Sequence, residues 1–225
     1  MTDEELLHVQ KVPLNDDAEG GPGIVIWTVN RPDKLNALNS EVNAAIITAA
    51  AEAEKDDSIR VVIIRGASPP VPAEGERGKP PAFVAGADIT EFVGVDSKNI
   101  RKSFKADPWD AVWNISKPTI AMVDGFALGG GCELALSCDL RIASTRSMFG
   151  TPEINLGLIP GGGATQRLAR LVGYGKALEM VMSGELMPAA EAHRVGLANY
   201  VLPPEKLEEM TMTIARNLAS KSPHT

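Results

Sequence analysis

Two glutamates, Glu133 and Glu153, stand in surroundings that suit proton transfer. Glu133 follows a run of glycines at a predicted helix start, where a carboxylate also commonly complements the helix dipole. Glu153 follows Thr151-Pro152 in an otherwise apolar stretch, and burying an unpaired carboxylate there is costly or forces protonation. Two carboxylates in one dry pocket have pKa values pushed apart, so that one donates a proton while the other accepts one. If the fold brings them together, this pair suits the addition of water to a double bond.

Two glycine-containing turns could supply hydrogen-bond donors for the carbonyl group of a substrate. Ala85-Gly86-Ala87-Asp88 and the run Gly125 to Leu134 each lead from a predicted strand into a predicted helix. Backbone N–H groups at a helix start lack intrahelical partners and carry partial positive charge. Two such turns facing one cavity could donate two hydrogen bonds to a carbonyl oxygen and form an oxyanion hole for a thioester enolate. The alternative is that the glycines only permit tight strand-to-helix packing.

The elements that must position these residues alternate between strands and helices. Buried strands are predicted from β-branched runs between turn residues. These strands cover residues 24–29, 60–65, 83–85, 118–123 and 140–143. Helices are predicted at 41–55, capped by Asn39 or Ser40, and at 132–137. The alternation indicates an α/β domain without a repeat of fixed period.

The remaining segments complete this prediction. Residues 68–81, rich in proline, glycine and charge, are expected to form an exposed loop. Asp88 and Glu91 have the spacing of a capping box that opens a helix at Ile89, and a helical region is expected to continue to about Ser116. Residues 165–219 are predicted to be mostly helical, with one short strand near 198–202.

Composition excludes several functional classes. The chain has 225 residues, enough for one sizeable domain, and a formal net charge of -7, which disfavours nucleic acid and anionic membranes as partners. Its acidic N-terminus lacks the basic start of a targeting peptide, and no apolar run reaches about 18 residues, so a cytoplasmic location is expected. Cys132 and Cys138 are predicted to be buried and reduced, on a helix and the strand after it. No histidine borders a glycine turn, and neither a metal site nor a phosphate-binding loop is predicted.

Four runs of sequence together carry a specific resemblance. In chain order they are Asn30 to Leu38 (NRPDKLNAL), Ala85 to Asp88 (AGAD), Gly125 to Leu134 (GFALGGGCEL) and Thr151 to Leu168 (TPEINLGLIPGGGATQRL). With them, the chain from about Gly23 onward resembles the crotonase (enoyl-CoA hydratase/isomerase) superfamily. The resemblance implies a ClpP/crotonase-like α/β fold, a spiral of repeated ββα units with a helical C-terminal region. It also implies assembly as a homotrimer or a dimer of trimers.

The resemblance assigns roles to particular residues. The backbone N–H groups of Ala87 and Gly130 match the family's oxyanion hole, and Glu133 and Glu153 match its two catalytic glutamates. Further positions fall where the family contacts substrate or CoA, largely through backbone. These are Lys34, Leu35, Ala37, Ala85, Gly86, Asp88 and Ile89. No cofactor is implied, because CoA is part of the substrate.

The same comparison divides the chain into three parts. Residues 1–22 are an N-terminal segment, 23–200 the crotonase core, and 201–225 the start of a C-terminal helical region that is apparently shortened relative to the family. In the family, the further C-terminal helices often cover the acyl pocket and lend a basic residue to a CoA phosphate. The loop 68–81 is longer and richer in proline than is usual there, and it leads into the substrate turn.

Glutamate at both catalytic positions favours a hydratase (a hydro-lyase) within this superfamily. The expected reaction is reversible hydration of a 2-enoyl-CoA such as crotonyl-CoA, or in the other direction dehydration of 3-hydroxybutyryl-CoA or 3-hydroxypropionyl-CoA. The first alternative is a Δ3,Δ2-enoyl-CoA isomerase, in which one glutamate shuttles a proton. The second is a non-catalytic acyl-CoA-binding or RNA-binding relative, of which the acidic charge balance disfavours the RNA-binding form.

Overall fold

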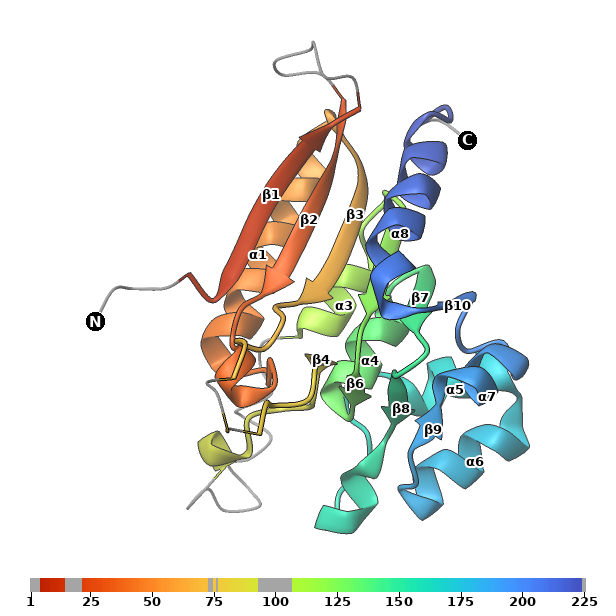
Figure 1. Cartoon of the computed structure of the whole chain (residues 1–225). Helices are drawn as coiled ribbons and strands as arrows, with labels where there is room; N and C mark the ends of the chain where they lie inside the picture. Colours follow the sequence, from red (N-terminus) through yellow and green to blue (C-terminus); the bar gives the residue numbers. More distant parts are fainter. Residues whose placement is uncertain (1–4, 15–21, 73–74, 76, 93–106, 224–225) are drawn as a thin grey trace.

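The computed structural model describes residues 5–14, 22–72, 75, 77–92 and 107–223. A larger and a smaller β-sheet form its framework (Figure 1). The six-stranded sheet has the order β1-β2-β3-β5-β7-β10, and only β1 runs antiparallel to its neighbour. Its strands are β1 (Leu7–Pro13), β2 (Gly23–Val29), β3 (Ile59–Gly66), β5 (Thr119–Val123), β7 (Leu140–Ser144) and β10 (Tyr200–Leu202).

The four-stranded sheet has the order β4-β6-β8-β9. Its strands are β4 (Ala82–Val84), β6 (Phe126–Leu128), β8 (Met148–Gly150) and the antiparallel β9 (Met187–Pro188). Along the chain, β3, β5 and β7 enter the large sheet and are each followed by a strand of the small sheet. The strand pairs therefore repeat with helices after them, which confirms the ββα spiral that the resemblance implied.

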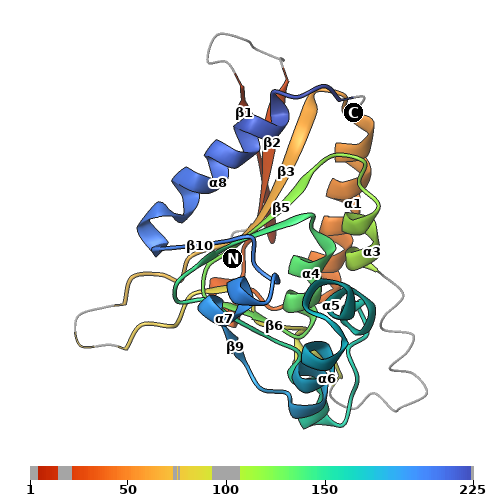
Figure 2. The ribbon, with the colours of Figure 1, turned by 90° about the vertical axis from the view of Figure 1, so that its right-hand side faces the viewer.

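Helices cover both faces of the large sheet. The helices of the described residues are α1 (Ser40–Lys55), α3 (Pro108–Trp113), α4 (Gly130–Ser137), α5 (Ala164–Val172), α6 (Tyr174–Ser183), α7 (Ala189–Arg194) and α8 (Pro204–Ala219). The part of the chain that the structure describes also contains three 3-10 turns: η1 (Pro32–Lys34), η2 (Ile89–Phe92) and η3 (Pro152–Leu156). Figure 2 shows α8 on one face of the large sheet, with α1, α3 and α4 stacked in succession on the other.

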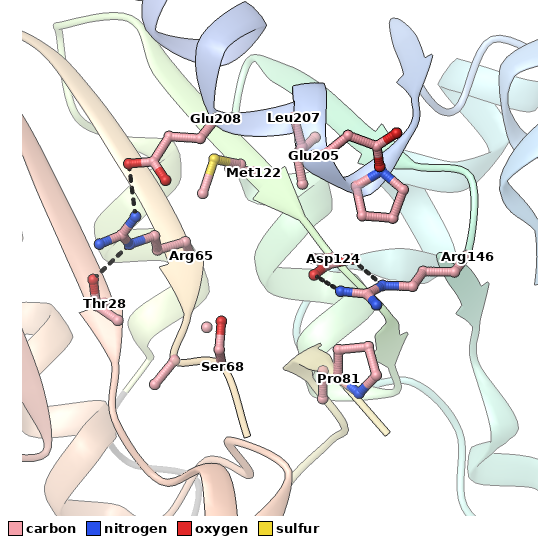
Figure 3. Close-up of a pocket in the computed structure, with 14 residues that line it drawn as sticks. Thr28, Arg65, Ser68, Pro81, Met122, Asp124, Arg146, Glu205, Leu207 and Glu208 are labelled. Atoms are coloured by element: carbon pink, nitrogen blue, oxygen red, sulfur yellow. Dashed lines mark hydrogen bonds and ion pairs between the residues drawn. The ribbon is translucent and has the colours of Figure 1, made fainter. Parts of the chain in front are cut away.

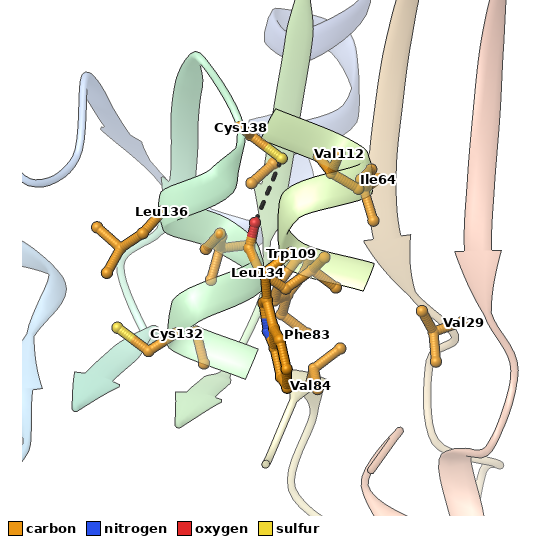
Figure 4. Packing of buried hydrophobic residues seen from close by; sticks show 14 of the residues in the cluster. Val29, Ile64, Phe83, Val84, Trp109, Val112, Cys132, Leu134, Leu136 and Cys138 are labelled. Atoms are coloured by element: carbon orange, nitrogen blue, oxygen red, sulfur yellow. Dashed lines mark hydrogen bonds between the residues drawn. The ribbon is translucent and has the colours of Figure 1, made fainter. Parts of the chain in front are cut away.

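Because side chains alternate along each strand, the large sheet has one hydrophobic cluster on each face. In β2, Val25 and Trp27 belong to the cluster under the stacked helices, whereas Ile24 and Ile26 face α8. In the first cluster, Trp109 packs with residues of β4 and α4 (Figure 4). Every residue of α4 is buried, so this short helix has a fixed position inside the protein.

Asn36 pins the loop before α1 to the rest of the fold. Its side chain is 1 % exposed, accepts a hydrogen bond from Arg31 N–H (3.0 Å) and donates to the carbonyls of Ala67 (2.9 Å) and Ala82 (2.7 Å). Leu35 and Asn36 both have positive φ, 51° and 57°, which is uncommon outside glycine. These three hydrogen bonds, of which the one to Ala82 is buried, hold this backbone conformation in place.

Most predicted elements are confirmed. The structure contains the five predicted strands, the helix at 40–55 with Asn39 as its N-cap, α4 and a mostly helical C-terminal third. The described residues of 68–81 contain no helix or strand, and β4 follows directly after them. Cys132 and Cys138 are free and buried, although Cys138 caps α4 instead of lying in the following strand. The helical region expected from Ile89 to about Ser116 is described at its two ends only, as η2 and α3, and residues 93–106 lie outside the described residues.

Several short or edge elements were not predicted. β1 is an edge strand of mostly exposed residues, and β6, β8 and β9 have three residues or fewer. β6 lies inside the segment that was interpreted as a turn because of its glycines. Among the described residues, no helix combines the length and apolarity needed to cross a membrane.

We expect Asn36→Ala to lower the free energy of unfolding by about 2 to 4 kcal/mol, because it removes a hydrogen-bond partner from the buried Ala82 carbonyl and from two half-buried backbone groups. Asn217→Ala, at an exposed position of α8, serves as the matched control and should change it by less than about 0.5 kcal/mol. Chemical denaturation measures both values, and equal effects of the two substitutions would contradict the role assigned to Asn36.

Candidate active site

A cavity of about 440 Å³ opens between the small sheet, α3 and η3. Glu133 and Glu153 both line it, together with Ala87, Gly129 and Gly130. Its remaining wall is largely apolar and includes Ile89, Trp109, Leu156, Leu158 and Ile159. The structure therefore brings together the four residues that the sequence analysis selected for chemistry.

Two backbone N–H groups at this cavity lack acceptors. Leu38 forms a parallel bridge with Ala87, in which its N–H donates to Gly86 and its carbonyl accepts from Asp88. This pattern leaves the N–H of Ala87 itself directed away from the bridge. Gly130 is the first residue of α4, where an N–H has no intrahelical acceptor. Within the described chain neither group has an acceptor.

The two donors also lie close together. A Cβ placed on Gly130 would be 3.8 Å from the Ala87 nitrogen. At the preceding residue, Gly129, φ is 51°, so the turn into α4 adopts a conformation that glycine accepts without a steric penalty. One carbonyl oxygen could accept from both groups in this arrangement.

Glu133 is 2 % exposed, and one of its oxygens is held by a distant loop. Oε1 accepts hydrogen bonds from Gly162 N–H (2.7 Å) and Ala164 N–H (3.0 Å). Burial raises the pKa of the Glu133 carboxyl to about 7, and the nearby Glu153 adds to this rise. The hydrogen bonds from Ala164 N–H and Gly162 N–H and the charge of Arg167 lower the pKa and so limit the rise. A carboxyl with this pKa can exchange a proton near neutral pH.

Glu153 reaches the same cavity from η3. A Cβ on Gly129 would lie 3.1 Å from Glu153 Oε1, so this carboxyl packs directly against the glycine turn. Its Oε2 is buried and has no hydrogen-bond partner within the described residues. Burial raises the pKa of Glu153, which favours the protonated form. An unpartnered buried oxygen beside a cavity is well placed to act on a ligand.

Trp109 links both halves of the site, a role that sequence reasoning missed. Its Nε1 donates to the carbonyl of Gly130 at 2.8 Å. A Cβ on Gly162 would come within 2.4 Å of the indole ring, so the ring lies flush with that glycine. The available signal was Gly161-Gly162-Gly163 before a helix, which indicates a close approach by another group.

The residues predicted to contact substrate or CoA divide into two groups. Ala85, Gly86 and Ile89 line the cavity. The other four lie outside its lining, with Lys34 exposed, and their role in binding CoA stays a prediction. They are Lys34, Leu35, Ala37 and Asp88.

Asp88 is held by protein groups. Its Oδ2 pairs with Arg31 at 2.8 Å and its Oδ1 accepts from Thr90; these hydrogen bonds, that of the Thr90 hydroxyl foremost, lower the pKa of Asp88 to about 2. The predicted reciprocal capping box is wrong: Glu91 accepts from Ser40 N–H at 3.0 Å and so caps α1, which satisfies a free donor there. Asp88 begins only a 3-10 turn.

A second cleft, of about 560 Å³, lies where the large sheet meets the start of α8 (Figure 3). Arg146 pairs with Asp124 through two hydrogen bonds, and Arg65 pairs with Glu208 (3.3 Å). These side chains satisfy one another across a polar surface. The cleft does not contain the paired glutamates and free N–H groups of the first cavity.

Comparison with known proteins agrees with this geometry. Residues 19–225 match the family model described as enoyl-CoA hydratase/isomerase. The chain belongs to this family. It is 42 % identical over 202 residues to the short-chain-enoyl-CoA hydratase of Clostridium acetobutylicum, covering 89 % of this chain and 73 % of that protein.

Other members give the same result. The crotonyl-CoA hydratase of Syntrophomonas wolfei is 38 % identical over 200 residues, covering 88 % of this chain and 73 % of the relative. An enoyl-CoA hydratase crystal structure from Geobacillus kaustophilus superposes with a TM-score of 0.84 at 38 % identity, covering 99 % of this chain and 78 % of that one. Both the crotonase fold and the family are thereby established.

The raised pKa of Glu133 predicts that the difference in stability between wild type and Glu133→Gln depends on pH. Because the folded-state pKa is about 7 and the ordinary value is 4.5, wild-type stability that is present below pH 4.5 is lost as the pH rises through 7. Glu133→Gln lacks this loss, so its stability relative to wild type should rise by roughly 3 kcal/mol from pH 4.5 to pH 8. Urea denaturation across this range measures it; a constant difference would contradict the assigned environment.

Proposed function

We propose that the chain adds water reversibly across the C2=C3 bond of a 2-enoyl-CoA, with Glu133 and Glu153 as its catalytic residues. The observation that carries the proposal is the presence of both carboxyls in one cavity beside the N–H groups of Ala87 and Gly130. Family membership implies an acyl-CoA thioester as the ligand, and the reaction type is that of a hydro-lyase. Crotonyl-CoA is the proposed test substrate.

The thioester carbonyl docks between the Ala87 and Gly130 N–H groups, which stabilise the enolate oxygen as charge develops there. Glu133, with one oxygen held by the 162–164 backbone, accepts a proton from the water that attacks C3. Glu153, in its protonated form, delivers a proton to C2. In the reverse direction the two residues exchange roles and a 3-hydroxyacyl-CoA loses water.

Isomerisation of a 3-enoyl-CoA requires one carboxyl that moves a proton between two carbons. A second carboxyl with a buried oxygen and its own raised pKa has no task in that reaction, whereas water addition needs one base and one acid. This division of work favours hydration over isomerisation. A non-catalytic thioester-binding protein would need neither carboxyl.

Several finer statements stay proposals of the same kind. The apolar wall formed by Leu156, Leu158 and Ile159 suits the hydrocarbon part of the acyl group. Lys34, Leu35 and Ala37 are proposed to contact CoA. The homotrimeric or hexameric assembly and the cytoplasmic location also stay predictions, as does dehydration of 3-hydroxypropionyl-CoA to acryloyl-CoA.

Incubation with crotonyl-CoA tests the proposal. Hydration removes the ultraviolet absorbance of the conjugated enoyl thioester and adds the mass of one water. A 3-enoyl-CoA substrate that is converted to its 2-enoyl isomer without any hydroxyacyl product would point to an isomerase. Tight thioester binding without turnover of either compound would overturn catalysis altogether.

Glu153→Gln should reduce kcat for hydration by roughly 10²- to 10⁴-fold, because an amide cannot deliver the proton to C2. The dissociation constant for crotonyl-CoA should change less than about threefold, since the N–H groups that bind the carbonyl remain. Glu185→Gln, at an exposed position outside the cavity, is the matched control. Full turnover in Glu153→Gln would remove this residue from the mechanism.

A further inference from the structure

Arg167, whose charge lowers the pKa of Glu133, also contacts the loop that holds Glu133. Its Nη1 donates to the carbonyl of Gly162 at 2.6 Å. That carbonyl belongs to the peptide between residues 162 and 163. The peptides on either side carry the Gly162 and Ala164 N–H groups that bind Glu133 Oε1. A fixed orientation of the central peptide therefore aims both donors at the same oxygen.

The guanidinium is itself held on a defined path. Its Cζ lies 4.6 Å from the ring centroid of Trp113, one helical turn after Trp109 in α3. A Cβ on Gly163 would lie 2.2 Å from Arg167 Nη1, so the guanidinium packs against that glycine, whose φ is 105°. The loop is thus enclosed by Trp109 on Gly162 and by Arg167 on Gly163.

We propose that Arg167 is a positioning residue, which locks the 162–163 peptide so that the flanking N–H groups hold one oxygen of Glu133 and leave the other for the reacting water. This proposal rests on the function proposed above. Arg167 itself does not line the cavity.

Charge acts in the same direction as geometry. Arg167 and the two N–H groups lower the pKa of Glu133, against burial and Glu153, which raise it. Other groups on the neighbouring elements that bear on these two residues are Asp107 and Asp110 at α3 and the buried thiols of Cys132 and Cys138 at α4. Without Arg167, Glu133 should bind its proton more tightly and become a base only at higher pH.

The test compares Arg167→Met, which keeps the aliphatic stem, with Arg167→Lys, which keeps the charge. For Arg167→Met we expect kcat to fall roughly 10- to 100-fold, with KM for crotonyl-CoA changed less than about threefold. The acidic limb of its pH–rate profile should move to higher pH, because the Arg167 charge lowers the pKa of Glu133. Arg167→Lys should restore the position of that limb and part of kcat. Arg170→Met, an exposed neighbour on α5, should match wild type.

A direct titration separates this proposal from the hydratase proposal. The ¹³C signal of the Glu133 carboxyl, identified by its loss in Glu133→Gln, should titrate at higher pH in Arg167→Met than in wild type. If the Glu133 titration shifts in this way but the wild-type protein does not hydrate crotonyl-CoA, the positioning role of Arg167 is supported and the proposed hydratase function is rejected. An unchanged titration in a folded variant would overturn the proposal, as would equal losses in Arg167→Met and Arg167→Lys.

If Arg167→Met does not fold, Trp113→Leu replaces it. Trp113 is 54 % exposed, so its removal should spare the core while taking away the surface on which the guanidinium stacks. The same upward shift of the Glu133 titration, of smaller size, is then expected. Its absence would overturn the proposal.

Discussion

The constraint on which the site depends is the burial of one carboxylate, that of Glu133, inside a helix with no exposed residue. A buried charge needs partners, and Glu133 has them in the N–H groups of Gly162 and Ala164, about thirty positions later in the chain. The loop between η3 and α5 must therefore lie against α4. Trp109 packs on that loop and leaves no space for a side chain at position 162.

The spiral repeats one arrangement, strand to turn to helix, and the site uses it twice. The turn after β4 presents Ala87 N–H, and the turn after β6 presents Gly130 N–H. Because β4 and β6 are parallel neighbours in the small sheet, their carboxyl ends open on the same side. Leu38 and Asn36 then secure the first turn from outside the sheet, through the bridge to Ala87 and the hydrogen bond to Ala82. Two donors that are distant in sequence become neighbours for this reason.

Local sequence patterns predicted most of what depends on local contacts. The buried strands, the Asn39 cap, the two glycine turns and the choice of Glu133 and Glu153 came from periodicity, turn residues and local surroundings. The assignment of Ala87 and Gly130 within those turns came from the family resemblance. The predictions that were wrong or missing concern features that depend on partners far along the chain. Glu91 has the spacing of a reciprocal cap, but Ser40 offers it a free N–H from another helix. The three-residue strands exist because neighbouring strands pair with them, which no short window of sequence records.

The central claim is that Glu133 and Glu153 act as one unit on one thioester. Residues that act as a unit show strongly non-additive losses when they are removed together. The deciding measurement is kcat/KM for crotonyl-CoA in Glu133→Gln, Glu153→Gln and the double variant. The account predicts that the double variant is little slower than the slower single variant. A loss in the double variant equal to the product of the two single losses would show that the carboxyls act independently, and would contradict it.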